Sequence, residues 1–420
     1  MERIRKYELD NGLKTVFYQM KNTYSVALYI SVNTGSAFEA RSENGITHFL
    51  EHIHFRRLND MSQKDIYCAA DRIGGNLNAR TYKERLIFSI KVRPRFLRDA
   101  VGLFEKILTA GNWTEEDIEN EKKVVLNEIG SKEDIFDLEA CVDETVFSGS
   151  PLAMPTPGTE GTVAAFCLDD ILKAKANAFS KGNTAVIAAG NFDDRDIEYI
   201  NELFGKVKLG DREKTENNFK FKRTERFMEC DFEYTNVIAS FFVDKSIDAR
   251  ALELLDCITG GGTGSMLQRN VREKGGFSYD IYSYIEEYAP ASLINISFSA
   301  HSSNVVKAFG EAINTLNSLK SGIGPADYDE NIVYYTDNLW YKMESPERIG
   351  DDLCWQVFEE LKDIEDIIAE YENIKCEDLT RIARHIFTPE NCSLLVAGAV
   401  SEDLKSEMRK AVESLGETRS

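Results

Sequence analysis

The residues best suited to chemistry in this 420-residue chain are two histidines and a glutamate within the pentapeptide His48–His52, HFLEH. On an α-helix, positions 48, 51 and 52 lie on one face, because residues three and four apart are neighbours there. Two neutral imidazoles can hold Zn²⁺ together with a third protein ligand and an open position for water. A carboxylate that does not bind the metal can take a proton from that water, and Glu51 is placed for this role.

The alternative interpretation is an ordinary amphipathic helix whose histidines and glutamate face solvent. One histidine alone would favour it, but the complete set inside the apolar segment Ile46–Phe55 favours a metal site. A further histidine, His54, lies about 200° around the helix from His52 and is expected to be structural. The identity of the third ligand therefore decides between the two interpretations.

A second expected helix supplies candidates for that ligand. It opens at a capping box formed by Thr114 and Asp117 and continues to about Ser131. Any one glutamate in such an acidic helix is more often a solvated surface residue than a ligand. Spacing alone does not select one, although two of the glutamates are seven residues apart on one face. The candidates are Glu115, Glu119, Glu121 and Glu128.

Composition restricts the class of protein. The apolar fraction of 43% and charged fraction of 29% are typical of a soluble globular protein, and 420 residues are too many for one core of usual size. The net charge of −21 disfavours nucleic-acid binding, which requires a basic surface. It permits attraction of basic peptides, although a merely solvated acidic surface is an equal alternative.

Targeting and cysteine signals are weak. The beginning of the chain has no apolar segment behind its charges, and no apolar run approaches the roughly 18 residues that span a bilayer. We therefore expect a cytoplasmic protein without a membrane segment. Eight scattered cysteines without a CxxC pair argue against a disulfide framework and against a cysteine zinc site.

The elements around the pentapeptide are expected to hold it rigidly. Residues 5–9 and 13–18 flank Asn11-Gly12, which predicts a hairpin turn. The apolar residues 25–32 predict a strand, and a polar loop leads from it to the pentapeptide helix. Residues 86–92 alternate and predict another strand.

An internal repeat divides the chain. Asn183-x-x-Val186-x-x-Ala189-Gly190 recurs as Asn391-x-x-Leu394-x-x-Ala397-Gly398, an offset of 208 positions (398 − 190). The charged stretch 208–225 between the copies is a plausible linker. The predicted domains are therefore a catalytic half, 1–207, and a homologous half, 226–420.

The second half is expected to lack a zinc site. The offset of 208 carries His48, Glu51 and His52 onto Asp256, Thr259 and Gly260. The glycine-rich stretch 260–265 that follows could suggest phosphate binding. However, no Lys-Ser/Thr pair follows it, and its spacing is not that of a dinucleotide-binding loop, so nucleotide binding is disfavoured.

Taken together, these segments resemble the pitrilysin or insulinase family of zinc peptidases with an inverted HxxEH motif. The resemblance rests on residues 48–52 followed 76 residues later by Glu128 (128 − 52), with Glu121 one heptad earlier. It extends to Gly74-Gly75 with Asn78-Ala79-x-Thr81, and to NTAVIAAG at 183–190 after Gly158-x-x-Gly161. It implies that His48, His52 and Glu128 bind one Zn²⁺ per chain, that Glu51 is the general base, and that Glu121 supports the site.

The resemblance also implies how substrate is held. In the second half, Arg272 and Tyr279 match the family's Arg/Tyr motif, which orients substrate and stabilises the oxyanion. Asn78 and Ala79, on an expected edge strand, would add the peptide as a further β-strand. The family's Phe-Lys-Gly-Thr-like turn is replaced by residues 55–58, Phe-Arg-Arg-Leu, so side-chain preference cannot be carried over.

The expected fold is α+β, with two homologous α/β halves that each pack a mostly antiparallel sheet with helices. The resemblance implies a clam-like homodimer, a heterodimer with a related subunit being the alternative. The expected function is zinc-dependent endopeptidase cleavage of peptides or unfolded segments in an enclosed chamber. The alternatives are a protease dedicated to maturing the leader peptides of a few precursors and, less favoured, a non-catalytic assembly or peptide-binding subunit.

Overall fold

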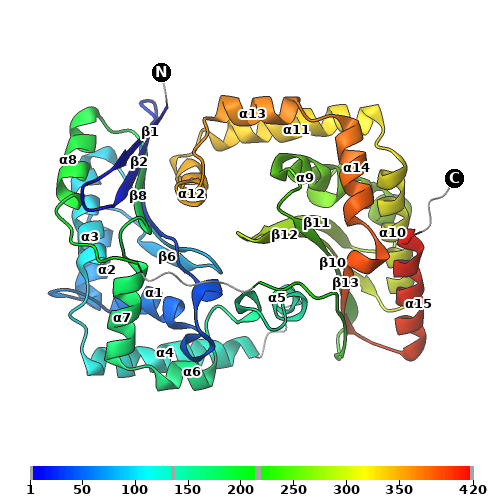
Figure 1. Cartoon of the computed structure of the whole chain (residues 1–420), viewed down its shortest axis with the longest axis horizontal. Helices are drawn as coiled ribbons and strands as arrows, with labels where there is room; N and C mark the ends of the chain where they lie inside the picture. The colour runs from blue at the N-terminus through cyan, green and yellow to red at the C-terminus, as the bar shows by residue number, and fades with distance from the viewer. Residues whose placement is uncertain (1–2, 134–137, 213–218, 417–420) are drawn as a thin grey trace. The chain divides into compact units, whose positions relative to one another are not determined.

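The computed structural model describes residues 3–133, 138–212 and 219–416 and divides into two compact units (Figure 1). The first unit contains the described parts of Met1–Phe136, Ser150–Asn218 and Trp340–Ile364. The second contains those of Asp137–Gly149, Phe219–Leu339 and Glu365–Ser420. Each unit is built on one mostly antiparallel sheet, which confirms the expected α+β class with two related halves. The clam-like dimer stays a prediction.

The first sheet has six strands in the order β1-β2-β8-β3-β7-β6. All neighbouring pairs are antiparallel except β2 with β8. The predicted hairpin is present, since β1 pairs with β2 across a turn in which Gly12 has φ of 80°. The strands are β1 (Ile4–Glu8), β2 (Lys14–Gln19), β3 (Val26–Val32), β6 (Asn78–Thr81), β7 (Leu86–Val92) and β8 (Thr184–Gly190).

The central strands of this sheet are covered on both faces. Every residue of β3 and β8 is buried, which explains why residues 26–32 are apolar without alternation. One face packs against α1 (Ile46–Arg56), α3 (Leu97–Thr109), α7 (Leu168–Ala178) and α8 (Asp194–Phe204). The other face packs against α12 (Pro346–Gln356), far along the chain. This unit also contains α2 (Gln63–Arg72), α4 (Glu115–Glu133), α6 (Glu160–Ala165) and the short hairpin of β4 (Arg57–Leu58) and β5 (Met61–Ser62).

The second sheet has five strands in the order β11-β12-β10-β13-β9. Like the first sheet it contains one parallel pair, β13 with β9. The offset of 208 carries β8 onto β13 (Cys392–Gly398) and α7 onto α14 (Cys376–Ile386) without a shift. The other strands are β9 (Glu225–Glu229), β10 (Tyr234–Asp244), β11 (Asp280–Glu287) and β12 (Ala291–His301). The other helices are α5 (Ala140–Val146), α9 (Ala249–Asp256), α10 (Val305–Ser321), α11 (Pro325–Lys342), α13 (Ile364–Glu372) and α15 (Glu402–Glu413).

The compact units depart from the predicted boundaries 1–207 and 226–420 in two places. Segment 137–149, with α5, belongs to the second unit, and segment 340–364, with α12, belongs to the first. The offset of 208 carries α5 onto residues 348–354 of α12, so the two helices are equivalent parts of the repeat. Each sheet requires a cover on its second face, and each half supplies that cover to the other. Residues 213–218 of the predicted linker 208–225 lie outside the described residues.

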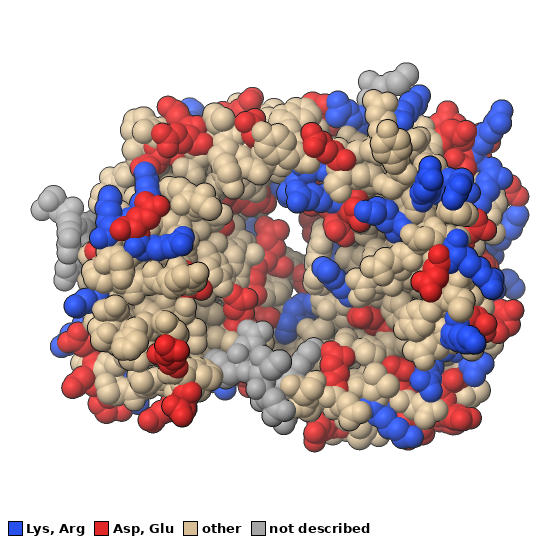
Figure 2. Space-filling model, turned by 180° about the vertical axis from the view of Figure 1, so that it is seen from behind, with Lys and Arg blue, Asp and Glu red and all other residues tan. Residues whose placement is uncertain are grey.

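Two surface properties follow from the described parts of both units. Among residues 3–133, 138–212 and 219–416, no helix combines the length and the apolar character needed to cross a bilayer. Acidic and basic side chains are interspersed on the face displayed in Figure 2.

Candidate metal centre

The helix that carries the pentapeptide, α1, begins at a tightly fixed point. Gly45, with φ of 93°, precedes it, and a side chain there would meet Gly158 Cα at 2.6 Å. The buried carboxylate of Glu39 accepts hydrogen bonds from the backbone N–H groups of Gly45 (2.8 Å) and Thr47 (2.9 Å). Burial raises the pKa of Glu39, whereas these hydrogen bonds act to lower it. A carboxylate at this end also suits the helix dipole, so the position of α1 is set before its histidines begin.

The sequence of α1 separates a core face from a chemical face. Phe49, Leu50 and Ile53 are buried in the main core of the first unit. His48, which is 8% exposed, and His52 lie on the face that contacts α4. The predicted capping box at the start of α4 is present, since Thr114 and Asp117 hydrogen-bond reciprocally. The two helices therefore bring together residues about 70 to 80 positions apart in the sequence.

Three of the predicted residues converge as a ligand set. His48 Nε2 lies 3.7 Å from Glu128 Oε1, and His52 Nε2 lies 3.3 Å from Glu128 Oε2. One ligand atom from each of these residues lies within 4.8 Å of the others, which is unique to this trio among groups of three or more His, Cys, Asp or Glu in the part of the chain that the structure describes. Two imidazole nitrogens and one carboxylate oxygen are a donor set that zinc uses in hydrolases.

Glu121 lies behind His52 rather than in the ligand set. Its Oε1 is 3.1 Å from His52 Nδ1, and its side chain is 7% exposed. When Nδ1–H donates to this carboxylate, Nε2 keeps its lone pair and can bind a metal. Burial lowers the pKa of His52, but hydrogen bonds to Glu121 and Glu128 outweigh it and raise the pKa to about 9. The cluster thus favours a positive charge at this ring, which fits a bound cation.

Glu51 lies next to the ligand set and contacts the sheet. Thr81 Oγ1, on β6, donates a hydrogen bond of 2.5 Å to Glu51 Oε2. Burial raises the pKa of Glu51, the Thr81 hydrogen bond opposes that shift, and the charge of Glu128 adds to it. A carboxyl group with a raised pKa suits proton transfer in both directions near neutral pH.

The predicted substrate strand is at the edge of the first sheet. β6 is the terminal strand of this sheet and, among the strands that the structure describes, pairs with β7 alone. Asn78 is exposed, whereas Ala79 is 7% exposed and points into the core. Gly75 precedes the strand, and a side chain there would meet Ile90 Cδ1 at 2.6 Å. Because β6 also carries Thr81, its free edge begins beside Glu51.

Arg272 and Tyr279 come together within the second unit. The Arg272 guanidinium lies over the Tyr279 ring at 5.9 Å, and Tyr279 is 81% exposed. Arg272 belongs to a π-helical segment, Gln268–Lys274. A cation and a phenol are thereby presented side by side on one surface.

The second unit has different residues where the first has its histidines. The helix α9 ends at Asp256 and continues as a π-helical turn, Cys257–Gly261. A side chain at Gly260 would meet Ser283 N at 2.4 Å, so this glycine permits close approach to β11. Burial raises the pKa of Asp256 to about 6, against a hydrogen bond with Ser283. The counterparts of the two histidines, Asp256 and Gly260, therefore supply no nitrogen ligand.

The structure defines the contacts of three other residues near the cluster. Thr81 falls within a motif noted for its resemblance to the family, and its hydroxyl binds the proposed base. Glu39 caps α1 from a polar loop. His54, 2% exposed, stacks on Phe179, and its Nδ1–H donates a hydrogen bond to Leu50 O. Burial lowers the pKa of His54 to about 3, which agrees with its predicted structural role.

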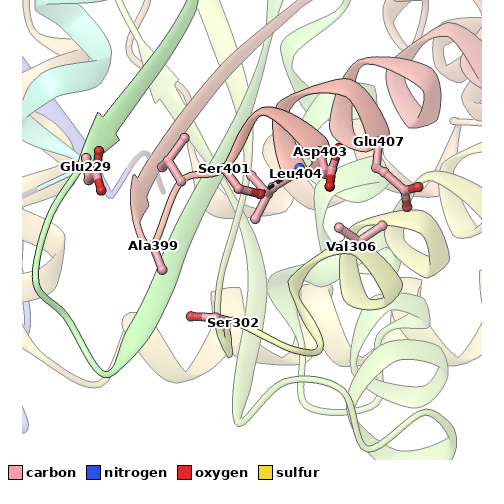
Figure 3. A pocket seen from close by; sticks show the side chains of 9 residues that line it. Glu229, Ser302, Val306, Ala399, Ser401, Asp403, Leu404 and Glu407 are labelled. Carbon is pink, nitrogen blue, oxygen red and sulfur yellow. Dashed lines mark hydrogen bonds between the residues drawn. The ribbon is translucent and has the colours of Figure 1, made fainter.

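A surface pocket in the second unit lacks this chemistry (Figure 3). It lies between the end of β9 and the start of α15. Its lining combines three carboxylates with small and apolar side chains and contains no histidine: Glu229, Ser302, Val306, Ala399, Val400, Ser401, Asp403, Leu404 and Glu407. The candidate site is therefore the cluster on α1 and α4.

Segments from both halves of the chain match known protein families. Residues 15–160 match the family described as Insulinase (Peptidase family M16), and residues 165–332 match the Peptidase M16 inactive domain. An uncharacterized zinc protease of Rickettsia bellii is 28% identical over 408 residues, covering 94% of this chain and 98% of its own. The uncharacterized zinc protease YmxG of Bacillus subtilis is 28% identical over 411 residues, with the same two shares.

Solved structures share the fold. A protease from Helicobacter pylori superposes with a TM-score of 0.86 at 20% identity, covering 94% of this chain and 99% of its own. A peptidase M16 inactive domain protein from Pseudomonas fluorescens superposes with a TM-score of 0.85 at 17% identity, covering 95% and 98%.

Proposed function

The chain belongs to the insulinase family of zinc proteases, peptidase family M16, and we propose that it is an endopeptidase whose reaction takes place at the histidine and glutamate cluster of α1 and α4. The observation that carries this proposal is the convergence of His48, His52 and Glu128 on one point. These three side chains would hold one zinc ion per chain.

The chemistry divides between the ion and the protein. Zinc, when bound, polarises the scissile carbonyl and lowers the pKa of its water to about 7. Glu51 takes the proton of the attacking water and later delivers it to the nitrogen of the leaving amine. The Thr81 hydroxyl donates to Glu51 Oε2 and so orients the carboxyl group of the base. Glu121 holds the His52 ring in the tautomer that directs Nε2 toward the ligand set.

The substrate we propose is a peptide or an unfolded protein segment. Asn78 and Ala79 lie on a strand with a free edge, and an extended chain added there gains main-chain hydrogen bonds with little demand on its side chains. A folded protein cannot present such a strand, so it should resist cleavage. Closure of this site within a chamber belongs to the same proposal.

Arg272 and Tyr279 are assigned to the oxyanion and to substrate orientation. Their proximity within the second unit supports a joint role, because a cation and a phenol donor both stabilise developing negative charge. We propose a homodimer in which this pair acts on the zinc site of the partner subunit. A heterodimer with a related subunit is the alternative, and the cytoplasmic location expected from the sequence remains a prediction.

Two other functions compete with general peptide cleavage. A protease dedicated to a few leader peptides would use the same residues and differ only in its substrates. A non-catalytic subunit is disfavoured, because such a protein has no need to keep a base beside a complete ligand set.

The test is cleavage of a random peptide library by the zinc-loaded protein and by Glu51→Gln. We expect the variant to keep its zinc and to lose about 10²- to 10⁴-fold in turnover, the usual contribution of a general acid or base. Removing zinc with a chelator should abolish cleavage while circular dichroism stays unchanged. Near-normal cleavage by Glu51→Gln would exclude the mechanism, and a few cleaved sequences instead of many would favour the dedicated maturation protease.

A further inference from the structure

The two helices of the metal centre carry a series of opposite charges that continues past the ligand set. His48, His52 and Arg56 lie one turn apart on one face of α1. Glu128 and Glu121 lie two turns apart on the facing side of α4. The contacts along this series are His48 Nε2–Glu128 Oε1 (3.7 Å), His52 Nε2–Glu128 Oε2 (3.3 Å), His52 Nδ1–Glu121 Oε1 (3.1 Å) and Arg56 Nη1–Glu121 Oε2 (4.0 Å).

Glu121 lies between His52, a proposed zinc ligand, and the guanidinium of Arg56. Its Oε1 faces His52, and its Oε2 faces Arg56. Exposed ion pairs contribute little to stability, but the side chain of Glu121 is only 7% exposed and that of Arg56 is 26% exposed. A buried carboxylate is stabilised when a positive partner and hydrogen bonds satisfy its oxygens.

The formal charges of the site also indicate that Glu121 has a positive partner besides the metal. Ionised Glu51, Glu121 and Glu128 bring three negative charges, of which a zinc ion balances two. Arg56 balances the third, at the side of Glu121 that His52 does not use. Without Arg56, we expect the Glu121 carboxylate to turn toward solvent and to lose its contact with the His52 ring.

We propose that Arg56 is a positioning residue of the zinc site, which fixes Glu121 so that Glu121 in turn keeps His52 Nε2 directed at the metal. This inference rests on the proposed function. Arg56 acts only through Glu121, and its removal should therefore affect zinc affinity rather than the proton transfer by Glu51. The residue lies in the stretch 55–58 that departs from the family's usual turn.

The chain offers a matched control in the adjacent arginine. Arg57 Nε and Nη2 bind Asp117 at 2.8 and 3.3 Å, one turn before Glu121 on the same helix. Replacing Arg57, the first residue after α1, removes the same charge from a neighbouring contact with α4, yet it leaves the contact between Arg56 and Glu121 in place. A general weakening of the α1–α4 packing would appear in both variants.

The experiment measures the zinc dissociation constant by competition with a fluorescent chelator. Arg56→Gln should bind zinc about three- to tenfold more weakly, less than the roughly 10- to 100-fold loss expected for Glu121→Gln, which removes the direct partner of His52. Arg56→Lys should restore most of the affinity, and Arg57→Gln should keep the wild-type value. In the double variant Arg56→Gln/Glu121→Gln, the loss should equal that of Glu121→Gln alone, because the two residues act in series.

Thermal unfolding of each variant checks that it is folded, and Arg56→Met, which also lacks the charge, provides the same test if Arg56→Gln is unstable. Wild-type zinc affinity in Arg56→Gln, or losses that multiply in the double variant, would overturn the inference. Failure of the proposed function would look different: His52→Ala would then bind zinc as tightly as the wild type. Weak binding by His52→Ala with unchanged binding by Arg56→Gln would remove the inference about Arg56 alone.

Discussion

The two units use the same arrangement of strands and helices, but they stabilise one equivalent pair of helices by different chemistry. In the first unit, α1 and α4 face each other through histidines and glutamates. In the second, the offset of 208 places α9 and α11 in the equivalent positions. There, Asp256, Gly260 and Thr336 replace the three proposed ligands.

A buried hydrogen-bond network occupies the second helix pair. Glu253 on α9 accepts from the hydroxyl of Tyr335 on α11 at 2.9 Å and from the hydroxyl of Tyr371 on α13. Arg250 Nη1 lies 3.1 Å from Glu253 Oε1 and supplies the compensating charge. Tyr371 is fully buried.

The helix pair of the second unit indicates that the scaffold does not depend on a metal. The same arrangement folds around tyrosine hydroxyls and the ion pairs of Arg250 with Glu253 and Glu370 in the second unit, so the charged residues of the first unit are not required for packing. Two histidines, one of them only 8% exposed, beside two glutamates are better explained by chemistry than by stability.

The largest expected effect tests whether the second unit takes part in the reaction. Arg272→Ala with Tyr279→Phe should lower kcat by about 10²- to 10³-fold, as removal of an oxyanion donor does elsewhere, while zinc content stays unchanged. If the pair serves the partner's site, mixing this variant with Glu51→Gln should restore about a quarter of wild-type activity, because half of randomly mixed dimers contain one complete site. No recovery after verified subunit exchange would contradict the proposed homodimer.

A smaller effect tests the network that replaces the metal cluster. Tyr371→Phe removes a buried hydroxyl that donates to a charged carboxylate, and should reduce the free energy of unfolding by about 1.5 to 3 kcal/mol. Urea unfolding followed by circular dichroism measures this loss. Tyr24→Phe, at a site that is 88% exposed, should be neutral. A change in zinc affinity in Tyr371→Phe would show that the two helix pairs are not independent.

The smallest expected effect concerns a histidine of α1 that serves only the fold. The pKa of His54 is about 3 in the folded protein, because of burial, against about 6.5 when unfolded. The unfolded state therefore binds the extra proton, and the stability that neutral His54 contributes is present above pH 6.5 and lost as the pH falls toward 3.

The corresponding measurement compares His54→Phe with the wild type, both with a chelator present so that zinc release does not contribute. Between pH 6 and 4, the free energy of unfolding of the variant should depend less steeply on pH by about 1.4 kcal/mol per pH unit. His301→Phe, at an exposed histidine, should keep the wild-type slope. Equal slopes in all three proteins would show that His54 is protonated inside the fold.

Local features of this architecture were readable from the sequence. The hairpin at Gly12, the strand at residues 26–32 and the cap formed by Thr114 and Asp117 each follow from short-range chemistry. The repeat was visible because β8 and β13 both keep their apolar pattern at one offset.

Long-range features were not readable in the same way. The pattern of an amphipathic helix indicates that the helix covers a sheet, but not which sheet it covers. The sequence therefore does not predict that α5 belongs to the second unit and α12 to the first. Spacing on α4 left four glutamates equivalent, and only family resemblance selected Glu128 as the expected ligand. The contact between Thr81 and Glu51 joins a strand edge to a helix, and it depends on packing that periodicity does not encode.

The central claim is that the chain holds one zinc ion, on α1 and α4, and none at the equivalent place in the second unit. Metal analysis after equilibrium dialysis against zinc tests it directly in the wild type, His52→Ala and Asp256→Ala. The account predicts one tightly bound zinc per chain in the wild type and in Asp256→Ala, and none in His52→Ala. Zinc retained by His52→Ala, or lost from Asp256→Ala, would contradict it.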